Sequence, residues 1–127
     1  MAALRHPRPF FLNLLRIKFP VGAVTSIGHR ISGVVLALWS PVLIYLLDSS
    51  LRSAQDYEWV RSLLDTTLAK GVALVMFWTF AHHFLAGVRH LLMDIDIGSS
   101  LPAARMSAWV VNIVSLSVAF LVGGMLL

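Results

Sequence analysis

Three long apolar stretches dominate the chain and leave few folds open to it. They cover residues 21–47, 66–93 and 106–127. Each is long enough to cross a hydrocarbon core about 30 Å thick, which needs about 20 helical residues. Only 13% of the 127 residues are charged, whereas about a quarter are charged in a typical soluble domain. We therefore predict an all-α integral membrane protein of one domain, built as a bundle of three transmembrane helices.

Polar segments connect the predicted spans. Residues 1–20 form a basic arm that is broken by prolines. The segment 48–65 is predicted to be a polar connection with a helical part at about residues 57–64, and the segment 94–105 is predicted to be a short loop. Pro41 lies inside the first span, where we expect it to kink the helix. The chain is thus predicted to cross the membrane three times with short connections.

The distribution of basic residues predicts how the chain is oriented. Cytoplasmic loops of membrane proteins carry an excess of Lys and Arg, which places the N-terminus in the cytoplasm and the C-terminus on the far side. The basic residues are not interleaved with aromatic ones, so no nucleic-acid surface is expected. The absence of cysteine excludes disulfides and thiolate metal sites. On the N-terminal side lie Arg5, Arg8, Arg16, Lys18, Arg30, Arg89 and Arg105, and on the other Arg52, Arg61 and Lys70.

Two polar clusters interrupt the apolar spans. The first, residues 25–33, reads Thr-Ser-Ile-Gly-His-Arg-Ile-Ser-Gly, and the second covers residues 82–94. Ionisable groups inside a bilayer are costly, so a functional site is the default hypothesis. The first span enters the membrane on the side where the second span leaves it. Both clusters are therefore predicted at similar depths, about 12 and 15 Å, in the same half of the membrane.

The spacing within each cluster favours a haem site. A glycine one turn from a histidine leaves a flat space for a planar macrocycle, haem iron takes axial imidazole, and Arg and His bind carboxylates such as haem propionates. The ordinary alternatives are hydrogen bonds between helices, snorkelling to the interface and close helix packing. The residues that share a face are Ser26, His29, Arg30 and Gly33 in the first span, and His83, Gly87 and His90 in the second.

One chain does not offer two good axial ligands for a haem. If His83 binds the iron, His82 points about 100° away from it on the same helix. His29 is better placed near the propionates. We therefore expect the second axial histidine to come from another chain, which makes this protein part of a hetero-oligomeric anchor.

Two stretches of this sequence resemble the signatures of a known family, the cytochrome b membrane-anchor subunit of succinate dehydrogenase. This is the larger anchor of respiratory complex II. The length, the three-span plan and the orientation agree with that family, although the third span matches only in its apolar character. The matching residues are Arg8-Pro9, Ile17-Lys18-Phe19-Pro20, Ser26-Ile27, His29-Arg30 and Ser32-Gly33, and then His83, Gly87, Arg89-His90 and Asp94.

The resemblance implies a role for each matching site residue. His83 matches the axial ligand of haem b, and the haem would be shared with a smaller anchor subunit that supplies the other histidine. Ser26, Ile27 and Arg30 match positions that line the quinone pocket. The residues expected around the haem and its propionates are His29, Arg30, Gly33, Gly87, Arg89 and His90.

The resemblance also implies partners and a location. The flavoprotein and iron–sulfur subunits would dock on the cytoplasmic face of a bacterial inner membrane, and electrons would pass from succinate to a quinone. The chain would anchor these subunits, contact membrane lipid and bind no nucleic acid. It would not oxidise succinate itself.

Three other interpretations stay open at this point. A fumarate reductase anchor runs the reaction in reverse and has similar motifs. A small transporter would use His and Arg as a proton relay, and a purely structural subunit would use its histidines for hydrogen bonds between helices. Within the haem interpretation, His82 stays a possible alternative ligand, although only His83 shares a face with Gly87 and His90.

Overall fold

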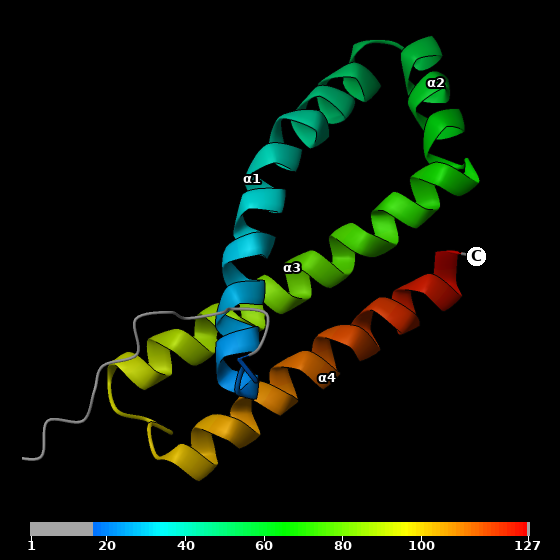
Figure 1. Ribbon diagram of the computed structural model, residues 1–127. Coiled ribbons are helices and arrows are strands. Elements are labelled where there is room, and N and C mark those ends of the chain that lie inside the picture. The colour runs from blue at the N-terminus through cyan, green and yellow to red at the C-terminus, as the bar shows by residue number, and fades with distance from the viewer. Residues whose placement is uncertain (1–16, 127) are drawn as a thin grey trace, which may run out of the picture.

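The computed structural model describes residues 17–126, so most of the predicted basic arm lies outside the described part. Four helices follow one another along the chain (Figure 1). Three of them are long and apolar enough to cross a membrane. The prediction of an all-α fold with three candidate spans is therefore confirmed. The helices are α1 (Val21–Arg52), α2 (Ala54–Leu64), α3 (Thr67–Asp94) and α4 (Leu101–Leu126).

The helix boundaries differ from the predicted ones mainly at the start of α4 and at the end of α1. This helix begins at Leu101, five residues before the predicted start at residue 106. Pro102 does not oppose this, because the first turn of a helix has no use for the missing N–H, and the Ala104 N–H already donates to the Ser100 carbonyl at 2.8 Å. Helix α1 continues to Arg52, five residues past the predicted end of the span. The short helix expected near residues 57–64 is present as α2.

The three long helices do not run parallel over their whole length. Helices α3 and α4 lie side by side and antiparallel, and α1 crosses them with its N-terminal half (Figure 1). The axis of α1 changes direction partway along, while the helix continues without a break through Pro41. As a result α1 and α3 diverge, and α2 joins their distant ends. We call the crossing region the histidine end and the region around α2 the α2 end.

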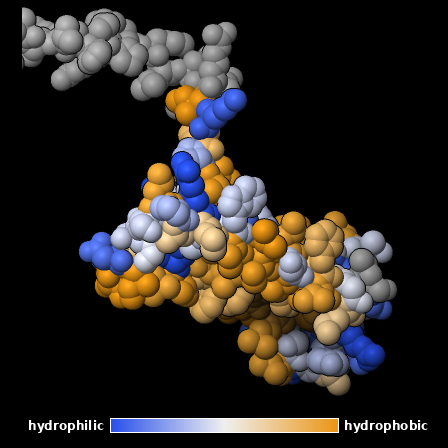
Figure 2. All heavy atoms as spheres, turned by 90° about the horizontal axis from the view of Figure 1, so that it is seen from below, coloured by the Kyte–Doolittle hydropathy of each residue, from blue (hydrophilic) through white to orange (hydrophobic). Residues whose placement is uncertain are grey.

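The interior of the bundle is polar and made of small residues. The buried residues on the three long helices include Thr25, Ser32, Thr79, Ala108 and Ser115, of which Thr25, Ala108 and Ser115 have no exposed surface. Large apolar side chains instead point outward and cover most of the face shown in Figure 2. Small residues let helix backbones approach closely in lipid, where burying Leu or Phe gives no advantage. Small buried residues with large apolar side chains on the outside are the arrangement expected of a helix bundle surrounded by lipid.

The turn between α3 and α4 reverses the chain, so that the two helices lie side by side and antiparallel. Helix α3 ends with the Ile97 N–H donating to the Leu92 carbonyl at 2.9 Å and the Asp96 N–H donating to the Met93 carbonyl at 3.1 Å. Asp96 has a φ of 61°, the left-handed conformation that ends many helices. Aspartate tolerates this conformation better than most residues. The reversal of direction is therefore complete within a few residues.

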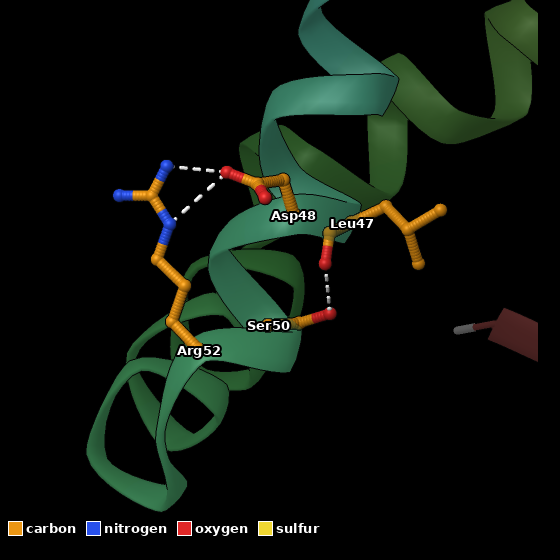
Figure 3. Close-up of polar contacts among 4 residues, drawn as sticks. All are labelled: Leu47, Asp48, Ser50 and Arg52. Carbon is orange, nitrogen blue, oxygen red and sulfur yellow. Dashed lines mark hydrogen bonds and ion pairs between the residues drawn. The ribbon is translucent and has the colours of Figure 1, made fainter.

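The far end of α1 carries its own charge pair at the surface. Arg52 donates to Asp48 from both Nε, at 3.0 Å, and a terminal guanidinium nitrogen (Figure 3). The Ser50 hydroxyl donates to the Leu47 carbonyl at 2.7 Å. Both charged side chains are more than half exposed, so this pair marks where α1 leaves the apolar region.

Candidate functional site

His83 is held by the backbone and a hydroxyl of the neighbouring helix. Its Nδ1 lies 3.1 Å from the His29 carbonyl oxygen and 3.1 Å from Ser32 Oγ. The Ser32 hydroxyl also donates to the His29 carbonyl at 2.9 Å. Within residues 17–126, Nε2 of His83 has no hydrogen-bond partner. The ring is therefore fixed through one nitrogen, and the other is left available to a ligand.

The two predicted polar clusters meet as the sequence predicted. The rings of His29 and His83 are stacked, with centroids 4.2 Å apart and planes 8° from parallel. The ring of His90 lies next to them, 5.0 Å from His29. Three imidazoles from α1 and α3 thus form one group at the histidine end.

Two glycines make room for these rings. A Cβ atom at Gly33 would lie 2.9 Å from Cε1 of His83, closer than such contacts occur in proteins. A Cβ atom at Gly87 would lie 3.3 Å from Nε2 of His29. Each glycine therefore lies opposite a histidine of the other helix and allows it to approach the backbone.

Ser26, Ile27 and Arg30, the residues predicted to line a quinone pocket, lie on α1 at the same end. Ile27 is 43% exposed, Arg30 is exposed and Ser26 is half-buried. In the described part of the chain no hydrogen bond or ion pair joins Arg30 to another residue. Its guanidinium is therefore free to bind a polar group outside this subunit's own fold.

Arg89 faces α4 in this structure. It is 8% exposed, and it donates from Nε to the Ser107 hydroxyl at 3.0 Å and from a terminal nitrogen to the Ala104 carbonyl at 3.1 Å. Its predicted place near a haem propionate stays a prediction. Nothing in the local sequence indicates that it links α3 to α4.

The sequence interpretation also missed a buried polar group at the crossing of the helices. Nε2 of His82 lies 3.2 Å from Oδ1 of Asn112, and Thr25 Oγ1 lies 3.3 Å from the same oxygen. These three residues belong to α3, α4 and α1. A signal for this contact was present, because Asn112 is the one side-chain amide in the third predicted span.

Comparison with known proteins identifies the family. The profile of the succinate dehydrogenase/fumarate reductase transmembrane subunit matches residues 5–122. The chain belongs to this family. A succinate dehydrogenase cytochrome b556 subunit from Coxiella burnetii is 40% identical over 117 residues, which cover 91% of this chain and 94% of that protein. The cytochrome b556 subunit from Paracoccus denitrificans is 31% identical over 108 residues, which cover 82% and 80%.

These relatives confirm the resemblance seen in the sequence. The protein is a cytochrome b membrane subunit of succinate dehydrogenase, and its three apolar helices make it a multi-pass bacterial membrane protein. A mouse mitochondrial relative, the cytochrome b560 subunit, is 31% identical over 105 residues, which cover 79% of this chain and 60% of that protein. The transporter interpretation gains no support from these matches.

Proposed function

We propose that this chain is the haem b-binding membrane anchor of a succinate:quinone oxidoreductase. It would hold the flavoprotein and iron–sulfur subunits at the membrane and form part of the site where quinone is reduced. The relatives named as succinate dehydrogenase subunits favour this direction of reaction over fumarate reduction. When bound, haem b supplies a one-electron carrier close to that site.

The observation that carries the proposal is the hydrogen bonding of His83. Histidines that bind metals usually donate their second ring N–H to a backbone carbonyl or carboxylate, which fixes the tautomer and the ring. His83 has this arrangement, with Nδ1 on the His29 carbonyl and Nε2 without a partner among the described residues. Its ring lies against Gly33, where no side chain blocks it. We therefore assign His83 as the axial ligand from this chain.

The neighbouring residues fit the rest of the group. Nδ1 of His90 is buried and has no hydrogen-bond partner in the described structure, so it is available to a bound carboxylate. His29 and Arg30 add further donors at the same end of the bundle, and Arg89 would do so through the guanidinium nitrogen that does not bind α4. Gly33 and Gly87 let the rings of His83 and His29 lie close to the helix backbones. In the proposal, these residues surround the haem. The histidine and arginine side chains among them hold its propionates by charge-assisted hydrogen bonds.

The quinone would meet α1 at Ser26, Ile27 and Arg30. The Ser26 hydroxyl and the Arg30 guanidinium are one turn apart, so both would donate to a carbonyl oxygen of the quinone. Such donors stabilise the negative charge that develops on this oxygen during reduction. Ile27 would contact the apolar part of the ring. The remainder of the pocket would come from the iron–sulfur subunit and the smaller anchor subunit.

The other partners follow from the same site. A smaller anchor subunit would supply the second axial histidine, since His82 is engaged with Asn112. The soluble subunits would dock on the cytoplasmic side, next to the histidine end. This orientation follows from the excess of Arg and Lys there.

The test is a difference spectrum of the complex, purified in detergent through this subunit. We expect a b-type α band in the dithionite-reduced minus air-oxidised spectrum of the wild type and its loss in His83→Ala. The band should remain in Val75→Ala, because Val75 is 53% exposed on the same helix and away from the site. A wild-type complex without this band, or a band that survives in His83→Ala, would overturn the haem assignment.

A second measurement tests the quinone assignment separately. Arg30→Ala should lower quinone reductase activity at least tenfold, while succinate oxidation with an artificial soluble acceptor should change little. A loss of one charged donor at a developing oxyanion costs about 10²–10³ in rate in well-studied enzymes. An equal loss of both activities would indicate failed assembly and would count against the assignment.

A further inference from the structure

His82 lies in a buried polar contact where three helices cross. It is 4% exposed, and its Nε2–H donates to Oδ1 of Asn112 at 3.2 Å. Thr25, which has no exposed surface, lies 3.3 Å from the same oxygen and 3.0 Å from the Val21 carbonyl. One amide oxygen therefore connects α1, α3 and α4 where these helices cross.

The ring of His82 is also held sterically. A Cβ atom at Gly28 would lie 2.7 Å from Cε1 of His82, so the imidazole lies directly against the backbone of α1. The indole of Trp78 lies near the ring as well, with centroids 5.6 Å apart. Since interiors are close-packed, a ring enclosed in this way has little freedom to change rotamer.

His82 and His83 are neighbours in sequence but serve different contacts. Successive side chains on a helix are about 100° apart. Fixing the direction of one of them about the axis of α3 therefore fixes the other. His82 points to Asn112 on α4, while His83 points to the His29 carbonyl and Ser32 on α1.

We propose that His82 is a positioning residue for His83. Its hydrogen bond to Asn112, whose amide oxygen also lies beside Thr25, sets the rotation of α3, and this rotation holds Nε2 of His83 where it would bind the haem. The inference rests on the proposed role of His83 as the axial ligand. It gives a role to the histidine that the sequence left as an alternative ligand, because Nε2 of His82 already has a partner in Asn112.

A comparison of single and double variants tests the inference in the purified complex. His82→Phe keeps a flat ring but removes the hydrogen bond, and Asn112→Leu removes the partner. Asn112→Leu leaves Nε2 of His82 unpaired, and His82→Phe removes one of the two groups beside Oδ1 of Asn112, so each single variant lowers stability. The double variant His82→Phe/Asn112→Leu leaves no unpaired polar group on these two residues, so its melting temperature should recover toward that of the wild type.

The haem readouts separate positioning from stability. In both single variants we expect haem content to be kept, the low-spin g-max in the electron paramagnetic resonance spectrum to shift, and haem loss to apomyoglobin to become about tenfold faster, as for other groups that orient a metal ligand. In the double variant the melting temperature should recover but the shifted g-max should remain. His82→Gln, which can still donate to Asn112, should restore part of the wild-type signal, and Val75→Ala should leave it unchanged.

Several results would overturn the inference. A wild-type g-max and haem-loss rate in His82→Phe would show that His82 has no influence on His83. Recovery of both haem readouts in the double variant would show a structural role only. If His82→Phe does not assemble, Asn112→Leu decides the question by the same readouts. Loss of the α band in His82→Phe with a band retained in His83→Ala would make His82 the ligand, whereas a wild-type complex without haem would overturn the proposed function instead.

Discussion

The two ends of this small bundle are built in opposite ways. At the histidine end α1, α3 and α4 cross, and the contacts are made by small and polar residues such as Thr25, Ala86 and Ser115, none of which has exposed surface. At the α2 end α1 and α3 diverge and leave an apolar cavity of about 590 Å³. The cavity is lined by large side chains that include Trp39, Tyr45, Trp59, Met76 and Phe80.

The difference shows what close packing in a membrane depends on. Lipid competes for apolar surface, so Leu and Trp at the α2 end gain little by facing one another. Lipid does not compete for close contacts between helix backbones or for hydrogen bonds between helices. The histidine end uses both, and it is therefore the part of the chain that can hold side chains in the fixed positions that a cofactor or substrate site needs.

The largest effect should come from adding volume at matched alanines of α3. Ala86 has no exposed surface, so Ala86→Leu would force the packed helices apart and destabilise the protein by about 3 kcal/mol. Ala73 lines the cavity at the α2 end, so Ala73→Leu should be accepted with little change. The check is the melting temperature of the detergent-purified complex, followed by tryptophan fluorescence. Equal destabilisation by both variants would mean that the cavity is filled in the assembled complex, and it would contradict the contrast between the two ends.

A smaller effect is expected from removing matched arginines. Arg89→Met removes two hydrogen bonds from a charged donor to Ser107 and Ala104, which should cost about 2 kcal/mol. Arg52→Met removes only the exposed pair with Asp48, and exposed pairs contribute little. Thermal unfolding of the two variants side by side should show a clear shift for Arg89→Met only. Equal shifts would contradict the contrast between the two ends.

Two helical glycines give a third, smaller contrast. In Gly28→Ala the new methyl group meets the His82 ring at 2.7 Å, and the gain in helix propensity offsets part of the strain, so a net loss of about 1 kcal/mol is expected. A Cβ atom at Gly71 would have no neighbour within 4 Å, so Gly71→Ala should stabilise the helix by up to about 1 kcal/mol. Opposite signs in the melting shifts support the comparison, and the same sign in both would refute it.

The smallest effect concerns pH at the α2 end. The Lys70 ammonium donates to Asp65 at 2.9 Å and holds the pKa of Asp65 below its usual value, first through the hydrogen bond and then through its charge. A lowered carboxyl pKa gives stability above the unfolded pKa of about 3.9, and this is lost as the pH falls through the folded value. The small stability difference between wild type and Asp65→Asn should therefore shrink as the pH falls from about pH 6 to below the unfolded pKa of about 3.9. A difference that stays constant over this range would argue against the ion pair as its source.

The hydropathy of the sequence was enough to predict the three spans, because a helix can cross a bilayer when its apolar stretch is long and carries few charges. The order of the helices along the chain was also enough to bring His29, His83 and His90 to one end. It was not enough to predict the partner of His82. A helix that is apolar on all sides gives no hydrophobic face from which to read its rotation. Only the packed structure shows that Asn112 and Thr25 face this histidine while Arg89 faces α4.

The early start of α4 was missed for a related reason. Residues 101–105 belong to the segment that was predicted to be a loop, which contains Gly98 and Pro102. In the structure Pro102 occupies the first turn of the helix, where it is tolerated. The Ala104 carbonyl in the same turn accepts from Arg89. The first turn of α4 is thus tied to α3 by a contact that local sequence does not reveal.

The adjacency of His82 and His83 makes α3 sensitive to changes in its length. Inserting one residue between Phe80 and Ala81 would rotate the first half of α3 by about 100° about the helix axis relative to the second half. The two imidazoles could then keep their own contacts only if the first half of the helix lost its packing. An insertion of seven residues would nearly restore the rotation, but it would lengthen the span by about 10 Å, a third of a typical bilayer core. Helix α3 should therefore tolerate few insertions or deletions, although it should tolerate substitutions at many positions on its lipid-facing side.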